Sequence, residues 1–172
     1  MSNSSSAGID ARLNYFGRLA YNYDSKYLFE FTFRRDGSLR FSKDVGRWGN
    51  FPSVLLGWTA SSEDFWQNNI QAINYFKLKA SWGQLGNDAV LPFQYLTMYA
   101  IGDGQTFGPS RGYQSSLYQV GEPNPNITWE VANVFNVGFE SFLLDSKLRF
   151  DIDAFYQKRT DILVARNASV PD

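Results

Sequence analysis

The chain lacks both cysteine and histidine over all of its 172 residues. Without cysteine there are no disulfides and no thiolate nucleophiles, and without histidine there is no histidine-dependent triad and no ordinary zinc site. A large excess of one charge is also missing, because the formal net charge is only −1. No global electrostatic field therefore favours nucleic acid as a partner. We expect no catalytic residue, no metal site and no cofactor in this chain.

Long hydrophobic runs are lacking as well. No stretch reaches the roughly 18 apolar residues that a transmembrane helix needs. The first ten residues, MSNSSSAGID, have neither the basic region nor the apolar region of a signal peptide. We expect residues 1–10 to be disordered or the start of a linker. What the chain has in abundance is aromatic side chains, at 17% of its residues, and these favour strands over helices.

Apolar and polar residues alternate with a period of two, which is the pattern of strands with two unlike faces. In 148–157, for example, Ile152 and Tyr156 alternate with Asp151 and Asp153, and no charge falls on the apolar set. The other segments repeat this sorting. The pattern predicts an all-β antiparallel sheet with strands near 11–23, 27–36, 50–59, 74–86, 128–143 and 147–161.

The predicted links between strands alternate in length. Residues 24–26 and 145–147 form tight turns, whereas 35–50 and 87–127 are long and rich in glycine and polar residues. In the link 60–73 we expect a short helix with Ser61 or Ser62 as its cap, and 93–100 with 113–120 are candidates for a hairpin above the sheet. Short turns at one end and long loops at the other are typical of an outer-membrane barrel.

Two architectures explain this alternation. A soluble β-sandwich, such as a carbohydrate-binding module, also has one apolar and one polar face per strand. The length of the strands and the aromatics at strand ends (Tyr21, Tyr23 and Tyr27 at one end, Trp82 near the other) favour a membrane barrel. Six strands are too few to close a barrel. We therefore expect residues 11–172 to be part of a larger transmembrane β-barrel.

Several motifs sharpen this expectation. Their order and spacing resemble the C-terminal barrel of the SusC/RagA family of TonB-linked outer-membrane proteins. The resemblance covers nearly the whole chain from about residue 12 to 170. The matching stretches are YNYDSKYLFEFTFRRDGSLRF (21–41), RWGNFPSVLLGW (47–58), KLKASWGQLGND (77–88), NPNITWE (124–130), FNVGFESFLLDSKLRFDIDAFYQKRTDIL (135–163) and ARNASVP (165–171).

The resemblance implies about six strands of a 22-stranded barrel in the outer membrane of a Gram-negative, Bacteroidetes-type bacterium. The tight turns would be periplasmic and the long loops extracellular. Such barrels import oligosaccharides or peptides together with a SusD-like surface lipoprotein, so the implied partners are that lipoprotein, the substrate and outer-membrane lipids. Energy would come through TonB, by way of segments absent from this chain.

Two sets of candidate residues follow. Asp151 and Asp153 have the spacing of paired catalytic carboxylates or of a Ca²⁺ site, but ordinary polar residues of a barrel lumen explain them better. The predicted lumen-facing set is Arg12, Arg18, Glu30, Lys77, Lys79, Glu140, Arg149, Asp151 and Asp153. The predicted contacts of external loops with a ligand or partner are Arg34, Arg35, Trp48, Phe107 and Tyr113.

Overall fold

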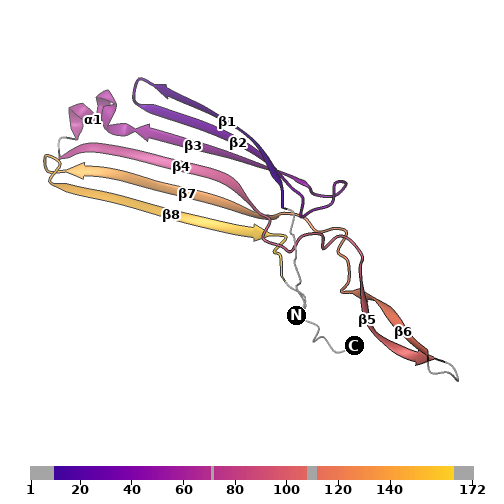
Figure 1. The fold of residues 1–172 in the computed structure, drawn as a ribbon. Coiled ribbons are helices and arrows are strands. Elements are labelled where there is room, and N and C mark those ends of the chain that lie inside the picture. The colour runs from indigo at the N-terminus through magenta and orange to yellow at the C-terminus, as the bar shows by residue number, and fades with distance from the viewer. Residues whose placement is uncertain (1–9, 71, 108–111, 165–172) are drawn as a thin grey trace, which may run out of the picture. The chain divides into compact units, whose positions relative to one another are not determined.

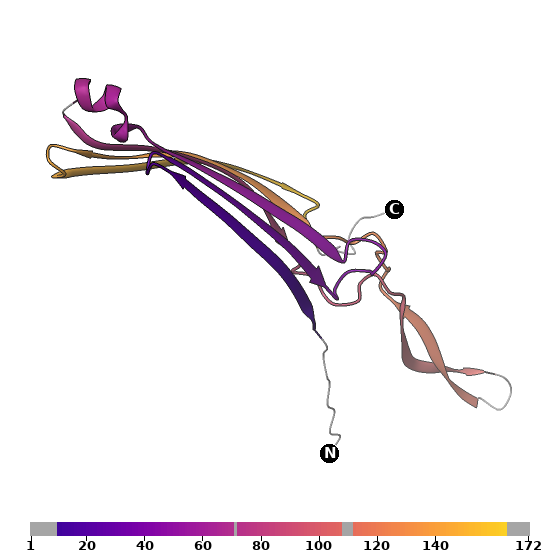
Figure 2. The ribbon, with the colours of Figure 1, turned by 90° about the horizontal axis from the view of Figure 1, so that it is seen from above.

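A computed structural model describes residues 10–70, 72–107 and 112–164. The chain divides into two compact units, and each is described by itself (Figures 1 and 2). We call them the sheet unit and the loop unit. The sheet unit comprises Leu13–Gly37, Trp48–Asn87 and Trp129–Asp172, and the loop unit comprises Met1–Arg12, Ser38–Arg47 and Asp88–Thr128.

The sheet unit is one antiparallel, up-and-down layer of six long strands (Figure 1). Their order in space is β1-β2-β3-β4-β7-β8, which is also their order in the sequence. The strands are β1 (Arg12–Tyr23), β2 (Tyr27–Ser38), β3 (Trp48–Thr59), β4 (Ile73–Asn87), β7 (Glu130–Leu143) and β8 (Leu148–Thr160). The all-β antiparallel prediction is confirmed.

One face of this sheet is an unbroken apolar surface. Directly opposed residues of antiparallel strands share a face, and three rows that cross β2, β3, β4, β7 and β8 contain only apolar residues. The rows are Tyr27-Trp58-Leu78-Phe139-Ile152, Phe29-Leu56-Ala80-Val137-Ala154 and Phe31-Val54-Trp82-Phe135-Tyr156. Among the described residues of the sheet unit no second sheet packs on this face, and Phe29 and Phe31 are 37% and 36% exposed. A closed sandwich core would have buried them.

The two tight turns are built alike. Each contains the tripeptide Asp-Ser-Lys, at 24–26 and at 145–147. Asp24, Ser25, Asp145 and Ser146 all have positive φ angles between 51° and 64°, a conformation that short polar side chains such as Asp tolerate and that matches the twist of paired strands. Since the six strands alternate in direction, both tight turns lie at the same end of the sheet, which we call the turn end.

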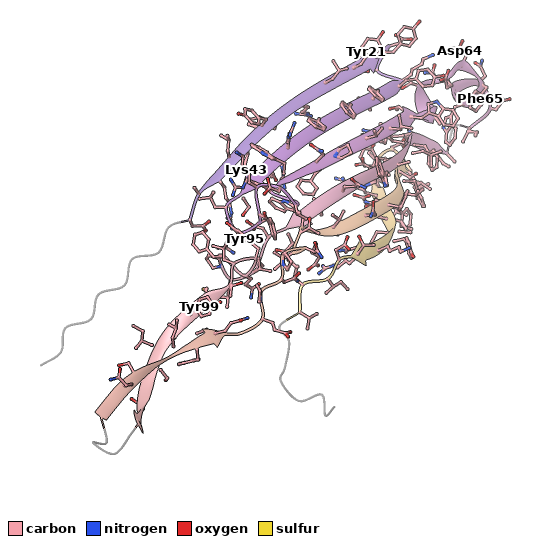
Figure 3. All side chains as sticks on the ribbon, turned by 90° about the vertical axis from the view of Figure 1, so that its right-hand side faces the viewer. Tyr21, Lys43, Asp64, Phe65, Tyr95 and Tyr99 are labelled. Carbon is pink, nitrogen blue, oxygen red and sulfur yellow. The ribbon has the colours of Figure 1, made fainter. Side chains whose placement is uncertain are left out.

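The link from β3 to β4 also lies at the turn end. It contains a 3-10 turn (Ala60–Ser62) and the helix α1 (Asp64–Asn69), from which Asp64 and Phe65 project (Figure 3). The expectation of a serine cap is wrong: the residue at the N-terminal cap of α1 is Glu63, whose side chain makes no capping hydrogen bond. The described part of the chain contains no helix long and apolar enough to cross a membrane.

The link from β2 to β3 is shorter than the sequence suggested. Residues 35–38 continue β2, where Arg35 pairs with Asn50, Asp36 with Gly49 and Gly37 with Trp48. The loop between the strands is reduced to 39–47. The polar residues 35–38 suggested a loop, but they belong to a part of β2 that extends past the apolar rows. Strand β3 extends with it, so residues 35–37 are still paired.

The loop unit contains a two-stranded hairpin of β5 (Met98–Phe107) and β6 (Gly112–Val120). The predicted second strand, 113–120, agrees with β6. The first strand lies five residues later than the predicted 93–100, because Phe93 has a positive φ of 62° and residues 92–95 form a turn that precedes the strand.

The sheet unit has a small aromatic core at the end opposite the turns, the loop end. Phe51 and Trp129 are only 4% and 6% exposed, and their ring centroids lie 5.4 Å apart in an edge-to-face arrangement. The Phe51 ring lies against Gly49 and Gly86 so closely that a Cβ atom on either would overlap it. Residues 49 and 86 must therefore be glycine for the Phe51 ring to occupy this position.

We expect Gly86→Ala to lower the free energy of unfolding by about 1–3 kcal/mol, the usual cost of overpacking a filled site. The added methyl group would have to displace the buried Phe51 ring. The matched control is Gly17→Ala in β1, where a Cβ atom meets nothing within 4 Å. Urea unfolding of the intact protein in detergent, followed by tryptophan fluorescence, measures both. Equal stability of the two variants would contradict the role given to Gly86.

Candidate functional site

The second face of the sheet is polar, and it carries most of the residues predicted to face a barrel lumen. Rows that alternate with the apolar rows place charges next to one another across β4, β7 and β8. Two of these rows read Thr59-Lys77-Glu140-Asp151 and Gly57-Lys79-Gly138-Asp153. The register therefore gathers Lys77, Lys79, Glu140, Asp151 and Asp153 into one cluster, which we call the charged patch.

Lys79 is the centre of the charged patch. Its Nζ atom donates to Asp151 Oδ1 at 2.7 Å and to Asp153 Oδ2 at 3.0 Å. These bonds cross from β4 to β8 over the intervening strand β7. The crossing is possible because Gly138 stands between Lys79 and Asp153: a Cβ atom there would overlap the Asp153 carboxylate. One ammonium group thus bridges both carboxylates, which are therefore not a free catalytic or Ca²⁺-binding pair.

Further ion pairs balance this face. Arg149 donates to Glu140 at 2.7 Å, and Arg18 of β1 donates to Glu30 of β2 at 2.6 Å. Lys77 has no ion pair among the described residues. Each of these pairs is partly exposed, so each contributes little to stability by itself. Together they produce a hydrated face on which opposite charges are interspersed.

The polar face also carries a shallow hollow of about 360 Å³. Its floor is made of small residues, because Ser53 and Gly83 are directly opposed and a Cβ atom on Gly83 would crowd Ser53. Glu30 and Arg34 bring opposite charges to its lining. A polar ligand passing over this face would find both hydrogen-bonding groups and a place to lie.

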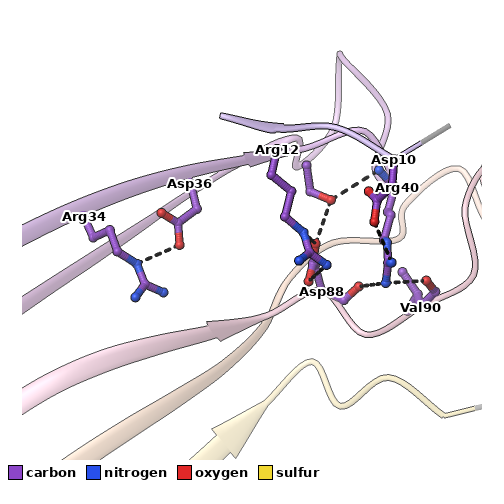
Figure 4. Close-up of polar contacts among 8 residues, drawn as sticks. Asp10, Arg12, Arg34, Asp36, Arg40, Asp88 and Val90 are labelled. Carbon is purple, nitrogen blue, oxygen red and sulfur yellow. Dashed lines mark hydrogen bonds and ion pairs between the residues drawn. The ribbon is translucent and has the colours of Figure 1, made fainter. Parts of the chain in front are cut away.

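Arg34 and Arg35 do not form a joint anion site. They are successive residues of β2, so their side chains point to opposite faces of the sheet. Arg34 Nε donates to Asp36 at 2.7 Å (Figure 4), and its guanidinium lies 5.7 Å from the centre of the Phe51 ring. Arg35 lies over the Trp48 ring at 5.0 Å, and Trp48 also stacks on Tyr15. These residues lie in paired strands and not in a loop.

Phe107 is the last residue of β5, and Tyr113 is the second residue of β6. Backbone pairing places both near the tip of the hairpin. Their side chains lie outside what the structure describes.

Arg12 belongs to a network in the loop unit that sequence reasoning missed. Asp88 accepts two hydrogen bonds from Arg12, at 3.0 and 3.1 Å, and one from the Ser38 hydroxyl at 2.8 Å (Figure 4). Arg40 donates to the backbone carbonyls of Asp88 and Val90 and to the Asp10 carboxylate. Segments far apart in the chain are thereby tied together. Only the common position of Asp88 and Ser38 at strand ends hinted at it.

Glu63, just before α1, is a second unanticipated centre. Its carboxylate accepts hydrogen bonds from the Tyr27 hydroxyl at 2.6 Å, from Trp58 Nε1 at 3.2 Å and from Lys26 Nζ at 3.3 Å. The Tyr27 and Trp58 bonds, followed by that of Lys26, hold the pKa of Glu63 below its ordinary value. The same carboxylate raises the pKa of Lys26. Both groups are therefore charged at neutral pH.

Comparison with known proteins agrees with this geometry. The family model described as "TonB dependent receptor-like, beta-barrel" matches residues 2–172. The TonB-dependent receptor SusC of Bacteroides thetaiotaomicron is 36% identical over 155 residues, and the TonB-dependent receptor P26 of Formosa agariphila is 34% identical over 152 residues. Each match covers 88% of this chain but 15% of the relative, so the chain spans about 15% of their length.

Solved structures share the fold. The RagAB peptide importer in its "closed-closed" state superposes with a TM-score of 0.75 at 22% identity, covering 89% of this chain and 16% of that one. Its "open-open" state gives a TM-score of 0.72 at 21% identity, covering 85% of this chain and 15% of that one.

We expect Lys79→Met to destabilise the intact protein more than an ordinary surface substitution does, because Asp151 and Asp153 would repel each other without the ammonium group between them. The control is Lys77→Met, which removes a neighbouring lysine that has no ion pair among the described residues. Its effect should stay within about 0.5 kcal/mol. Urea unfolding at low and high salt measures both, and the loss should shrink at high salt. Equal losses in the two variants would refute the bridging role.

Proposed function

This chain belongs to the TonB-dependent receptor β-barrel family, and from that membership we propose that its six-stranded sheet is a wall segment of a 22-stranded outer-membrane barrel. The barrel would import oligosaccharides or peptides into a Gram-negative bacterium of the Bacteroidetes type. The segment would perform no catalysis. It would separate the lipid from the path of the substrate and carry external loops.

The observation that supports this proposal best is the unbroken apolar face. Its three rows hold no charged side chain, and two of the corners are Tyr27 and Tyr156, whose amphipathic rings suit the membrane interface. Along β8 the apolar positions run from Leu148 to Tyr156, roughly 27 Å of strand. At a tilt of about 40° this covers about 20 Å, close to the roughly 25 Å apolar band of such barrels.

The polar face would then line the lumen. Lys79, Glu140 and Asp153 would meet water and not lipid, which is where charged residues of a barrel are tolerated. The paired charges leave no strong field of one sign, and neutral oligosaccharides or mixed peptides need none. The hollow over Ser53 and Gly83 is a place where a substrate, or another part of the protein, would make contact with this wall.

The relatives suggest how the complete protein would work. One is named SusC, and the superposed structures are of the RagAB peptide importer. By analogy we propose a SusD-like surface lipoprotein as a partner at the loop end. TonB would act through other segments of the protein, since the residues here are accounted for by wall and loops. Phe107 and Tyr113 in the hairpin are proposed contacts with the substrate or the lipoprotein.

The proposed orientation predicts where a membrane-impermeant maleimide will react. Ser25→Cys and Ser146→Cys place thiols in the two tight turns, and Ile101→Cys places one in the hairpin, where Ile101 is 78% exposed. On intact cells we expect the thiol at 101 to be labelled, and the thiols at 25 and 146 to be labelled only after the outer membrane is permeabilised. This segment has no native cysteine to interfere. Labelling of all three in intact cells would contradict the orientation.

Import itself is tested by deleting the gene and measuring uptake. We expect the deletion strain to lose accumulation of either labelled oligosaccharides or labelled peptides, and to recover it when the gene and that of an adjacent lipoprotein are restored. A third strain carrying the gene with its TonB-contacting segment removed is the control for energised transport. Unchanged uptake of both substrate classes after deletion would contradict the proposed function.

A further inference from the structure

The link between β3 and β4 does not simply turn at the end of the sheet: it folds back over the apolar face. Trp66 of α1 stacks on Phe76 of β4, with ring centroids 5.0 Å apart and planes 15° from parallel. Phe76 in turn stacks on Phe139 of β7 at 5.6 Å. Phe139 is a member of the first apolar row. The helix therefore lies against the face that we assign to lipid.

Glu63, the residue at the N-terminal cap of α1, fixes the same placement. The Tyr27 and Trp58 groups that it binds are both in the first apolar row, and they are directly opposed across β2 and β3. Its carboxylate, which is only 17% exposed, thus covers the polar tips of two aromatic side chains of the apolar face. The start of α1 is held at the boundary between the apolar rows and the turn end.

A helix this short is not stable by itself, so its contacts with the sheet must hold it in place. Trp66 Nε1 donates to the Ile73 carbonyl at 3.2 Å, and Trp66 is half-buried. Phe65, by contrast, is 53% exposed and has only the edge of Trp66 as a ring neighbour. Asp64, which precedes it, is exposed as well (Figure 3), and so is Gln67. Phe is among the side chains that interfacial helices bury at the boundary between headgroups and acyl chains.

We propose that α1 is a lipid-binding element, which lies among the phospholipid headgroups of the leaflet at the turn end and inserts Phe65 toward the acyl chains. This inference rests on the proposed function, because the apolar face must be the lipid face. Phospholipid is the expected occupant because α1 is continuous with that face: Trp66, Phe76 and Phe139 form one stack from the helix to the first apolar row. A protein partner at the turn end is the alternative that the test distinguishes.

The test introduces a photoreactive benzoylphenylalanine into the intact protein at one position at a time. Position 65 is the site of interest. Position 31, in the third apolar row, reports contact with lipid from the sheet itself. Position 155 is the matched negative control: Phe155 is 75% exposed but shares the polar face with Asp153. Each variant is reconstituted into vesicles of phosphatidylethanolamine and phosphatidylglycerol, irradiated and analysed by mass spectrometry.

We expect phospholipid adducts at positions 65 and 31 at yields at least about tenfold above that at position 155. An adduct at 31 without one at 65 would overturn the role of α1 while the proposed barrel stands. Absence of adducts at both would overturn the barrel orientation and with it this inference. Cross-links from position 65 only to other parts of the protein would likewise exclude lipid contact. Since Phe65 is exposed, its replacement leaves the packing of Trp66 on Phe76 intact, and thermal unfolding of the variant checks this.

Discussion

The register between neighbouring strands is the constraint on which the rest of this structure depends. Residues directly opposed across an antiparallel pair share a face, so Trp58 must follow Tyr27 and Leu78 must follow Trp58 if the apolar rows are to continue. A slip of one residue between β3 and β4 would bring Lys77 or Lys79 to the apolar face. A lysine at the middle of a bilayer costs about 2–4 kcal/mol. Lipid on the apolar face would therefore oppose such a slip.

The same register determines what is possible on the polar face. Because Gly138 is opposite both Lys79 and Asp153, the two charged side chains meet above a strand that has no side chain at that point. At the loop end the small size of Gly86 and Gly49 has a comparable effect, since it admits the Phe51 ring. Glycines here are not places of flexibility. They are places where a large or charged group from another strand occupies the space above the backbone.

The two ends of the sheet are stabilised by different means. At the turn end, two Asp-Ser-Lys turns and the carboxylate of Glu63 satisfy polar groups close to the apolar face, as an interface between lipid and water requires. In the loop unit, Asp88 and Arg40 tie separate segments through side-chain and backbone hydrogen bonds. Loops that are held by such networks present fixed surfaces.

The sequence by itself determined the sheet: period-two alternation is a local property, and it located the six strands, the tight turns and the family resemblance. It also placed Asp151 and Asp153 on the face of the sheet opposite to Ile152. Only the tertiary structure decided that Lys79 bridges both carboxylates, that Arg34 and Arg35 point to opposite faces of paired strands, and that Asp88 and Glu63 are centres of hydrogen bonding. The hydrogen bonds of Lys79, Asp88 and Glu63 join residues from 5 to 76 positions apart. Which residues meet in these contacts depends on strand register and on the path of the loops, and both are set by many residues acting together. Alternation, by contrast, follows from whether each side chain by itself is apolar or polar.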